Sequence, residues 1–188
     1  MASPNEIRRG TVLRQDGELA VVTEFQRVSP GKGSSFVRAR LKNLKTGKVK
    51  EVTFKSAETV AFEDVQYKKM QYLFADGMFC TFMDNVNYEQ VSMSVEDLGN
   101  DAAYLKEGLE VTVVMHDGNA VAIELPMKIK YKVSETEPAS KGDTASGNVQ
   151  KDAKMENGLL VRVPIFIKEG DEIIVNTQTS EYGERVTE

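Results

Sequence analysis

Apolar and polar residues alternate along most of this chain, and short turn sequences interrupt the alternation. Two such stretches, residues 19–28 and 35–44, flank the sequence Ser29-Pro30-Gly31-Lys32-Gly33-Ser34. A period of two predicts half-buried strands, and Pro-Gly-x-Gly between them predicts a hairpin turn. At about 3.3 Å per residue, the two arms carry the tip up to about 30 Å from the strand bases. The pattern therefore predicts a protruding hairpin with Lys32 at its tip.

Further strand patterns divide the chain into three segments. Residues 1–64 contain five short strand patterns with tight turns, which predicts a small SH3-like barrel. Residues 65–127 contain a hairpin signal at Asp76-Gly77, and later a short helical passage that ends at Gly108. Residues 128–188 complete the chain.

The third segment begins with strand-like residues and then becomes polar. Residues 135–157 are rich in Gly, Ser, Lys and Asp, which predicts a long loop, and apolar runs resume at residues 159–167 and 172–177. The second and third segments each have the length and strand content of a five-stranded OB-type barrel. We therefore expect an all-β fold with three small β-barrel domains in series.

Charge is unevenly distributed along the chain. The net charge is −5, but residues 1–63 carry 12 basic and 7 acidic residues, a net charge of +5. Residues 64–127 carry 3 basic and 11 acidic residues, a net charge of −8. A basic first segment on an acidic body favours contact between the first segment and phosphate.

Composition excludes several classes of protein. The chain has 188 residues, of which 28% are charged and 40% hydrophobic, and we expect neither a membrane span nor a signal peptide. A single cysteine is compatible with a reducing cytoplasm, so we expect a cytoplasmic location. Cys80 falls in an apolar strand and is expected in the core, whereas His116 falls in a turn beside Asp117 and is expected to be exposed. With one His and one Cys, we expect no metal site, no cofactor and no catalytic constellation.

Known phosphate-binding loops do not fit the glycine-rich turn. A P-loop needs Gly, four residues and then Gly-Lys-Ser/Thr, but Gly33 follows Lys32 here. A dinucleotide fingerprint also fails, because no helix pattern follows Phe36. For an arbitrary hairpin, a lysine in this position is an ordinary solvated turn residue.

Several motifs, in order along the chain, resemble those of the bacterial elongation factor P family, and the resemblance covers almost the whole sequence. The matching motifs are Pro30-Gly31-Lys32-Gly33, Asn43-Leu44-Lys45-Thr46-Gly47, Met70-Gln71-Tyr72-Leu73, Phe82-Met83-Asp84, Tyr88-Glu89-Gln90, Lys141-Gly142-Asp143-Thr144-Ala145, Val161-x-Val163-Pro164-x-x-Ile167-x-x-Gly170, Glu181-Tyr182 and Arg185-Val186. Two places depart from the family pattern. The chain lacks a proline between Lys151 and Ala153, and its terminal motif has Gly183-Glu184 in the middle.

The resemblance implies a KOW-type first domain and a function in translation. Similar proteins bind the ribosome, through both subunits, beside the peptidyl-tRNA and relieve stalling at consecutive prolines. By this resemblance Lys32 approaches the peptidyl-transferase centre, and a modifying enzyme extends its side chain with an aminoacyl-type group or an aminoalcohol, or leaves it unmodified. Pro30, Gly31 and Gly33 form the hairpin tip around it. We expect a monomer that is not an enzyme and does not bind membranes.

Four groups of residues are expected to contact RNA. Arg27, Arg38 and Arg40 lie near the hairpin, and the shared strand parity of Arg38, Arg40 and Lys42 predicts a common face. The other three groups follow from the resemblance. It places Gly99, Asn100 and Asp101 near the tRNA elbow. It places Gly142, Asp143 and Thr144 near the messenger RNA, and Tyr182 and Arg185 near the small subunit or tRNA.

A general single-strand nucleic-acid-binding OB protein is the alternative. That class needs exposed aromatic and basic residues on the barrel faces, and the net charge of −8 in residues 64–127 argues against it.

Overall fold

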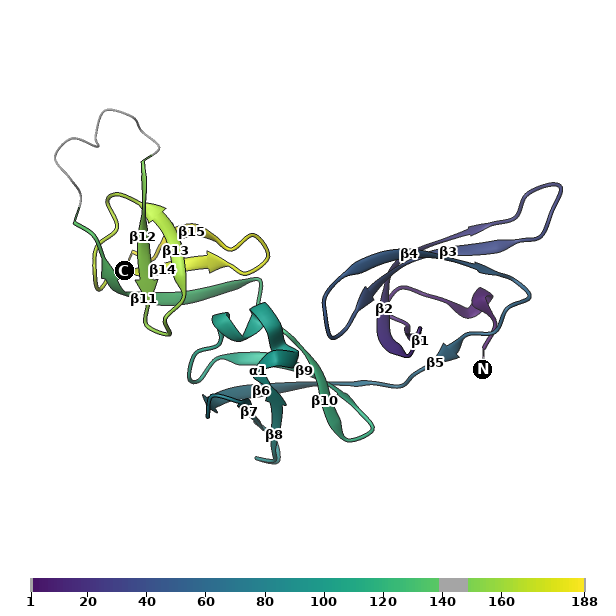
Figure 1. The fold of residues 1–188 in the computed structure, drawn as a ribbon, viewed down its shortest axis with the longest axis horizontal. Coiled ribbons are helices and arrows are strands. Elements are labelled where there is room, and N and C mark those ends of the chain that lie inside the picture. The colour runs from purple at the N-terminus through teal and green to yellow at the C-terminus, as the bar shows by residue number, and fades with distance from the viewer. Residues whose placement is uncertain (1, 139–148, 188) are drawn as a thin grey trace. The chain divides into compact units, whose positions relative to one another are not determined.

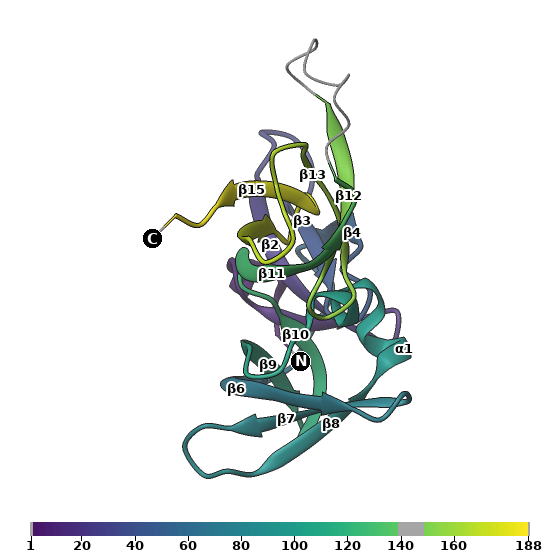
Figure 2. The same cartoon turned by 90° about the vertical axis from the view of Figure 1, so that its left-hand side faces the viewer.

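A computed structural model describes residues 2–138 and 149–187 and contains three five-stranded sheets (Figure 1, Figure 2). Helical structure in these residues is limited to two short 3₁₀ turns and the four-residue helix α1. The strands of each sheet curl rather than lie flat, as both views show. The prediction of an all-β fold with small barrels in series is confirmed.

The first sheet has the strand order β4-β3-β2-β1-β5. Its elements follow the 3₁₀ turn η1 (Pro4–Glu6) and are β1 (Val12–Gln15), β2 (Glu18–Val28), β3 (Phe36–Asn43), β4 (Val49–Lys55) and β5 (Ala61–Phe62). On the interior strand β3, Val37, Ala39 and Leu41 are buried, whereas Arg38 and Arg40 are exposed. This alternation puts one face of the sheet on the core and the other in solvent.

A β-bulge interrupts the ladder between β2 and β3. Val22 pairs with Leu41 and Glu24 pairs with Arg40, so Thr23 is the extra residue. An extra residue reverses which side chains of a strand face the core. Beyond the bulge, Phe25 therefore packs against the first core, and Glu24 shares the solvent face with Arg40.

The second sheet has the order β10-β9-β6-β7-β8. Its elements are β6 (Gln66–Ala75), β7 (Phe79–Asp84), β8 (Gln90–Ser94), α1 (Val95–Leu98), the 3₁₀ turn η2 (Gly99–Tyr104), β9 (Glu110–His116) and β10 (Asn119–Glu124). Asp76 closes the β6–β7 turn, because its carboxylate accepts the backbone N–H groups of Met78 and Phe79 at 2.9 and 2.8 Å. Cys80 is buried, as predicted.

The third sheet has the order β13-β12-β11-β14-β15. Its strands are β11 (Lys128–Thr136), β12 (Gln150–Met155), β13 (Leu160–Pro164), β14 (Glu172–Asn176) and β15 (Glu181–Arg185). The expectation of a loop throughout residues 135–157 is wrong, since β12 lies within it. Ala153 and Met155 face the core while charged residues alternate with them, and pairing with β11 and β13 satisfies the backbone.

Each sheet lies within one of the three predicted segments, whereas the compact units of the chain are two. One unit comprises Met1–Lys68, Glu96–Gly99 and Val113–Ala122, and the other comprises Lys69–Val95, Asn100–Thr112 and Ile123–Glu188. The domain boundaries 1–64, 65–127 and 128–188 stay a prediction.

Candidate functional site

The β2–β3 hairpin presents Lys32 at its tip. Figure 1 shows this hairpin projecting past the other strands of its sheet. The ladder continues to the pair Val28 and Phe36, so only residues 29–35 lie beyond it. Lys32 is exposed, and its amino group has no hydrogen-bond or ion-pair partner among residues 2–138 and 149–187. This side chain is free to contact something outside the protein.

Short polar contacts hold the base of the tip together. The hydroxyl groups of Ser35 and Ser29 are hydrogen-bonded across the hairpin at 3.2 Å. Both the hydroxyl and the backbone N–H of Ser56 donate to the Ser35 carbonyl, at 2.7 and 3.1 Å. Gly33 has φ +121°, a value that disfavours any residue with a Cβ. The turn sequence thus gives the tip a defined backbone path.

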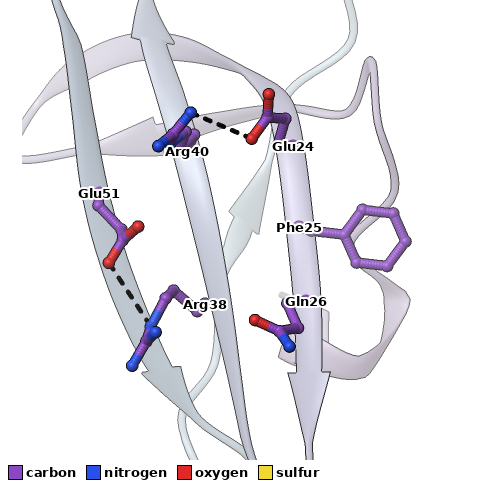
Figure 3. A pocket seen from close by; sticks show the side chains of 6 residues that line it. All are labelled: Glu24, Phe25, Gln26, Arg38, Arg40 and Glu51. Carbon is purple, nitrogen blue, oxygen red and sulfur yellow. Dashed lines mark hydrogen bonds and ion pairs between the residues drawn. The ribbon is translucent and has the colours of Figure 1, made fainter.

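Arg38 and Arg40 lie on the solvent face of the sheet beneath the tip (Figure 3). Lys42 has the same strand parity and is also exposed, as the sequence predicted. Each arginine meets a carboxylate of a neighbouring strand. Arg40 donates to Glu24 at 3.2 Å, and the guanidinium of Arg38 lies 3.5 Å from a carboxylate oxygen of Glu51. The result is a cationic face whose two arginines are paired but still solvated.

Arg27 lies on the other face of the hairpin from Arg38 and Arg40. Its guanidinium donates to the backbone carbonyls of Asn5 and Ile7 at 2.9 and 3.3 Å, and it stacks over the Phe25 ring at 5.3 Å. The bulge at Thr23 explains the difference, since it turns Arg27 toward the core side. These contacts tie the β2 arm of the hairpin to the N-terminal segment.

Gly99, Asn100 and Asp101 form the start of η2, directly after α1. Gly99 has φ +56°, and both Gly99 and Asn100 are exposed. The neighbouring Asp97 is paired with Lys45 at 2.7 Å. The loop therefore offers exposed backbone and an amide side chain, and its surroundings are acidic.

Tyr182 and Arg185 both lie on β15, but the Tyr182 ring is only partly available. It packs against the third core, and burial raises the pKa of its hydroxyl. Arg185 stacks over Phe166 at 5.7 Å and lies 3.9 Å from Asp171. Phe166 is 53% exposed, so it is the accessible aromatic ring here. The sequence did not reveal it because Phe166 lies within the apolar run 159–167, which indicated a strand.

The predicted site residues Gly142, Asp143 and Thr144 lie outside the described residues. They stay a prediction.

His116 does not behave as predicted. Its side chain is only 12% exposed, because its Nε2 atom is hydrogen-bonded to Glu63 at 2.9 Å, and Glu63 also accepts from Arg14 at 2.8 Å. The hydrogen bond with His116, followed by that from Arg14, lowers the pKa of Glu63. The expectation of an exposed His116 is wrong, since a turn position in the sequence does not reveal a distant carboxylate.

Two kinds of site are absent from the described residues. No group of three or more His, Cys, Asp or Glu side chains is placed to hold a metal ion in that part of the chain. No helix in the same residues is long and apolar enough to cross a bilayer.

Comparison with known families covers nearly all of the chain. Residues 3–60 match the family model described as the elongation factor P (EF-P) KOW-like domain. Residues 65–123 match the elongation factor P (EF-P) OB domain, and residues 129–185 match the model described as elongation factor P, C-terminal.

Two solved structures are similar to parts of the chain. Eukaryotic translation initiation factor 5A from Methanococcus jannaschii is 20% identical with a TM-score of 0.47, and the match covers 66% of this chain and 93% of that one. A translation initiation factor eIF-5A family protein from Naegleria fowleri is 15% identical with a TM-score of 0.48, and the match covers 66% and 96%.

Proposed function

Because this chain belongs to the elongation factor P family of translation elongation factors, we propose that it binds the ribosome beside the peptidyl-tRNA and relieves stalling at consecutive prolines. The observation that carries the proposal is Lys32, an exposed amine without a partner in the described residues, at the end of a hydrogen-bonded hairpin. The chain acts as a monomer in the cytoplasm and needs no cofactor.

The chemistry of proline explains why such a probe is useful. Proline has a fixed φ and a constrained secondary amine, so runs of it hold the peptidyl and acceptor groups in poor geometry for attack. Holding reactants in good alignment accelerates a reaction without any acid, base or nucleophile from the protein. A cation that contacts the acceptor end of the tRNA provides that alignment, and we infer that the chain is not itself an enzyme.

The hairpin suits this role because its position is determined by the sheet. Its ladder joins the central strand β2 to β3, and Ser56, which follows β4, donates to the Ser35 carbonyl just before β3. A modifying enzyme extends Lys32, which lengthens its reach and adds hydrogen-bonding groups.

The remaining contacts anchor the protein on RNA. Arg38 and Arg40 bind phosphates of the tRNA, and the exposed loop at Gly99 and Asn100 lies against the tRNA elbow. We propose that residues 142–144 contact the messenger RNA and that Arg185 contacts the small subunit or tRNA. Phe166 stacks on RNA at the place where the sequence predicted a Tyr182 contact, because its ring is the more exposed of the two.

Substitution of Lys32 tests the proposal. Lys32→Ala removes an exposed side chain, so the free energy of unfolding changes by no more than about 0.5 kcal/mol. The rate of Pro-Pro-Pro peptide formation on purified ribosomes falls by about tenfold or more, because the alignment is lost. Ribosome binding is largely retained. Lys32→Arg is also defective, since arginine keeps the charge but cannot accept a lysine-specific extension.

The control is Lys48→Ala, which removes an exposed lysine from another turn of the same sheet. This variant is expected to keep full activity. Full stimulation of Pro-Pro-Pro synthesis by Lys32→Ala would refute the proposed role of the hairpin tip.

A further inference from the structure

Two carboxylates lie within the cationic face of the first sheet. Arg38 and Arg40 are on β3, Glu24 is on the neighbouring strand β2 and Glu51 is on the neighbouring strand β4 (Figure 3). Glu24 and Glu51 are the two register partners of Arg40, one on each side. Arg40 uses the first, and Arg38 reaches diagonally to the second. Each of these two guanidinium groups thus has its own carboxylate.

The position of Glu24 depends on the bulge at Thr23. Without the extra residue, Glu24 would keep the parity of Ala20 and Val22, which are 4% and 1% exposed and face the core. With it, Glu24 stands directly opposite Arg40. The irregularity therefore places an acid on the face that carries the arginines.

The two ion pairs are weak enough to exchange. The paired side chains are 48% to 68% exposed, and ion pairs in such positions contribute little free energy because water screens them. Phosphate competes with carboxylate for arginine, since the oxygens of both groups match the planar guanidinium in a bidentate contact. A nucleic acid backbone can therefore displace the carboxylates, but the displaced acids then repel it.

The surroundings of the pairs suit a chain of phosphates. The four side chains and Gln26 line a shallow hollow of about 240 Å³, while the Phe25 side chain points away from it in Figure 3. Arg38 and Arg40 are two residues apart on one strand, so they are about 6.6 Å apart along it. Lys42 and Lys55 have the matching strand parity and extend the cationic face beyond the hollow.

We propose that Glu24 and Glu51 determine the RNA selectivity of this face by competing with backbone phosphates for Arg40 and Arg38. An RNA that touches only this face must displace both acids and is bound weakly. An RNA that also engages the hairpin tip and other surfaces binds strongly enough to displace them. This inference rests on the proposed function only in taking RNA as the ligand.

Binding of a uridine dodecamer to the full chain tests this competition. The probe has no secondary structure and is measured without the ribosome, so it reports binding to the protein itself, and the arginine variants below show what part of this binding depends on the cationic face. We expect Glu24→Gln/Glu51→Gln to bind it about three- to tenfold more tightly than the wild type in low salt. The slope of log K against log salt concentration becomes steeper by about 0.7 for each additional phosphate that the protein neutralises.

The matched control is Glu18→Gln, which lies on the same strand as Glu24 and makes the same change in net charge as either single substitution. The Glu18 carboxylate accepts from the Asn43 amide instead of an arginine, so its substitution is expected to leave dodecamer affinity within twofold. A second control repeats the double substitution in a chain with Arg38→Gln and Arg40→Gln. The increase in affinity disappears there, because the acids no longer have a guanidinium to compete for.

Two results would overturn the inference. One is equal dodecamer affinity for the wild type and Glu24→Gln/Glu51→Gln. The other is an increase from Glu18→Gln equal to that from Glu24→Gln or Glu51→Gln, which would reduce the effect to net charge. The single variants Glu24→Gln and Glu51→Gln are measured in parallel, with a thermal melt for each, so that a folding defect in the double variant does not decide the outcome.

A peptide-synthesis assay separates this inference from the proposed function. With uridine dodecamer as competitor, the concentration of protein that gives half-maximal Pro-Pro-Pro synthesis increases more for the double variant than for the wild type. If dodecamer affinity is unchanged while Lys32→Ala abolishes stimulation, the selectivity inference fails and the proposed function stands. If the double variant binds the dodecamer more tightly but Lys32→Ala stimulates fully, the proposed function fails and the selectivity inference stands.

Discussion

Replacing Arg27 by methionine distinguishes two roles for this side chain, one in RNA binding and one in holding the hairpin. The sequence grouped Arg27 with Arg38 and Arg40 as an RNA contact. The structure shows instead that its guanidinium donates to the carbonyls of Asn5 and Ile7 and stacks on Phe25. Methionine keeps the length of the side chain and removes the donors and the charge.

The loss of stability expected for Arg27→Met depends on which other groups donate to the carbonyls of Asn5 and Ile7. Arg8 also donates to the Asn5 and Ile7 carbonyls, at 3.0 and 2.9 Å, so loss of Arg27 leaves neither oxygen without a donor. The cost is therefore the net value of a hydrogen bond, about 1 kcal/mol, rather than the larger penalty of a buried acceptor without a partner. Loss of the cation–π contact adds about 0.5 kcal/mol at an exposed site. For a chain of this size, the sum of about 1.5 kcal/mol lowers the melting temperature by about 3–6 °C.

Two measurements on the full chain give opposite patterns for the two roles. Thermal unfolding followed by circular dichroism is expected to show the decrease for Arg27→Met but not for Arg38→Met, whose side chain is solvated. Binding of single-stranded RNA at several salt concentrations is expected to give an unchanged slope for Arg27→Met and a slope smaller by about 0.7 for Arg38→Met. A smaller slope for Arg27→Met at unchanged melting temperature would refute the positioning role and restore the RNA contact.

Two further predictions concern stability elsewhere in the chain. Hydrogen bonds with His116 and Arg14 lower the pKa of Glu63 in the folded state from its ordinary value of 4.5, so the stabilising effect of the ionised carboxylate is present above that value and is lost as the pH falls through the folded pKa. Between about pH 5 and pH 3, the melting temperature should therefore fall more steeply for the wild type than for Glu63→Gln. Parallel curves would contradict this prediction. The buried Tyr131 hydroxyl donates to the Tyr104 carbonyl at 2.5 Å, so Tyr131→Phe should lower the free energy of unfolding in urea by about 1–2 kcal/mol, and an unchanged midpoint would show that the bond contributes nothing.

The hairpin and its tip were predictable because local chemistry determines them. Alternating apolar and polar residues on both arms predict two half-buried strands. The sequence between them favours a turn, because Pro30 has a fixed φ and Gly33 permits a φ of +121°. The face shared by Arg38 and Arg40 followed for the same reason, since parity on an unbroken strand needs no tertiary information. Lys32 could therefore be assigned to an exposed tip from the sequence.

Features that depend on distant partners were not predictable. The polar strand β12 has too few apolar residues to be recognised alone, and it is a strand because β11 and β13 pair with both of its edges. The burial of His116 depends on Glu63, which is 53 residues away. Neither the pairing of β12 nor the contact between Glu63 and His116 can be recognised from the sequence near β12 or near His116.

The bulge at Thr23 depends on the pairing of β2 with β3, and it changes which charged side chains lie on the cationic face. Residues 19–28 contain no turn signal, so strand parity alone places Arg27 and Thr23 on one face and Glu24 on the other, with the core residues Ala20 and Val22. One extra residue in the ladder exchanges those faces beyond it. Arg27 is thereby turned to the side of the N-terminal segment, and Glu24 takes the place opposite Arg40 that Thr23 would otherwise have. This exchange removes a cation and adds an anion, so it lowers the net charge of the face by two. The lower charge weakens the attraction of the face for any polyanion. Binding therefore depends on contacts made elsewhere, above all at the hairpin tip.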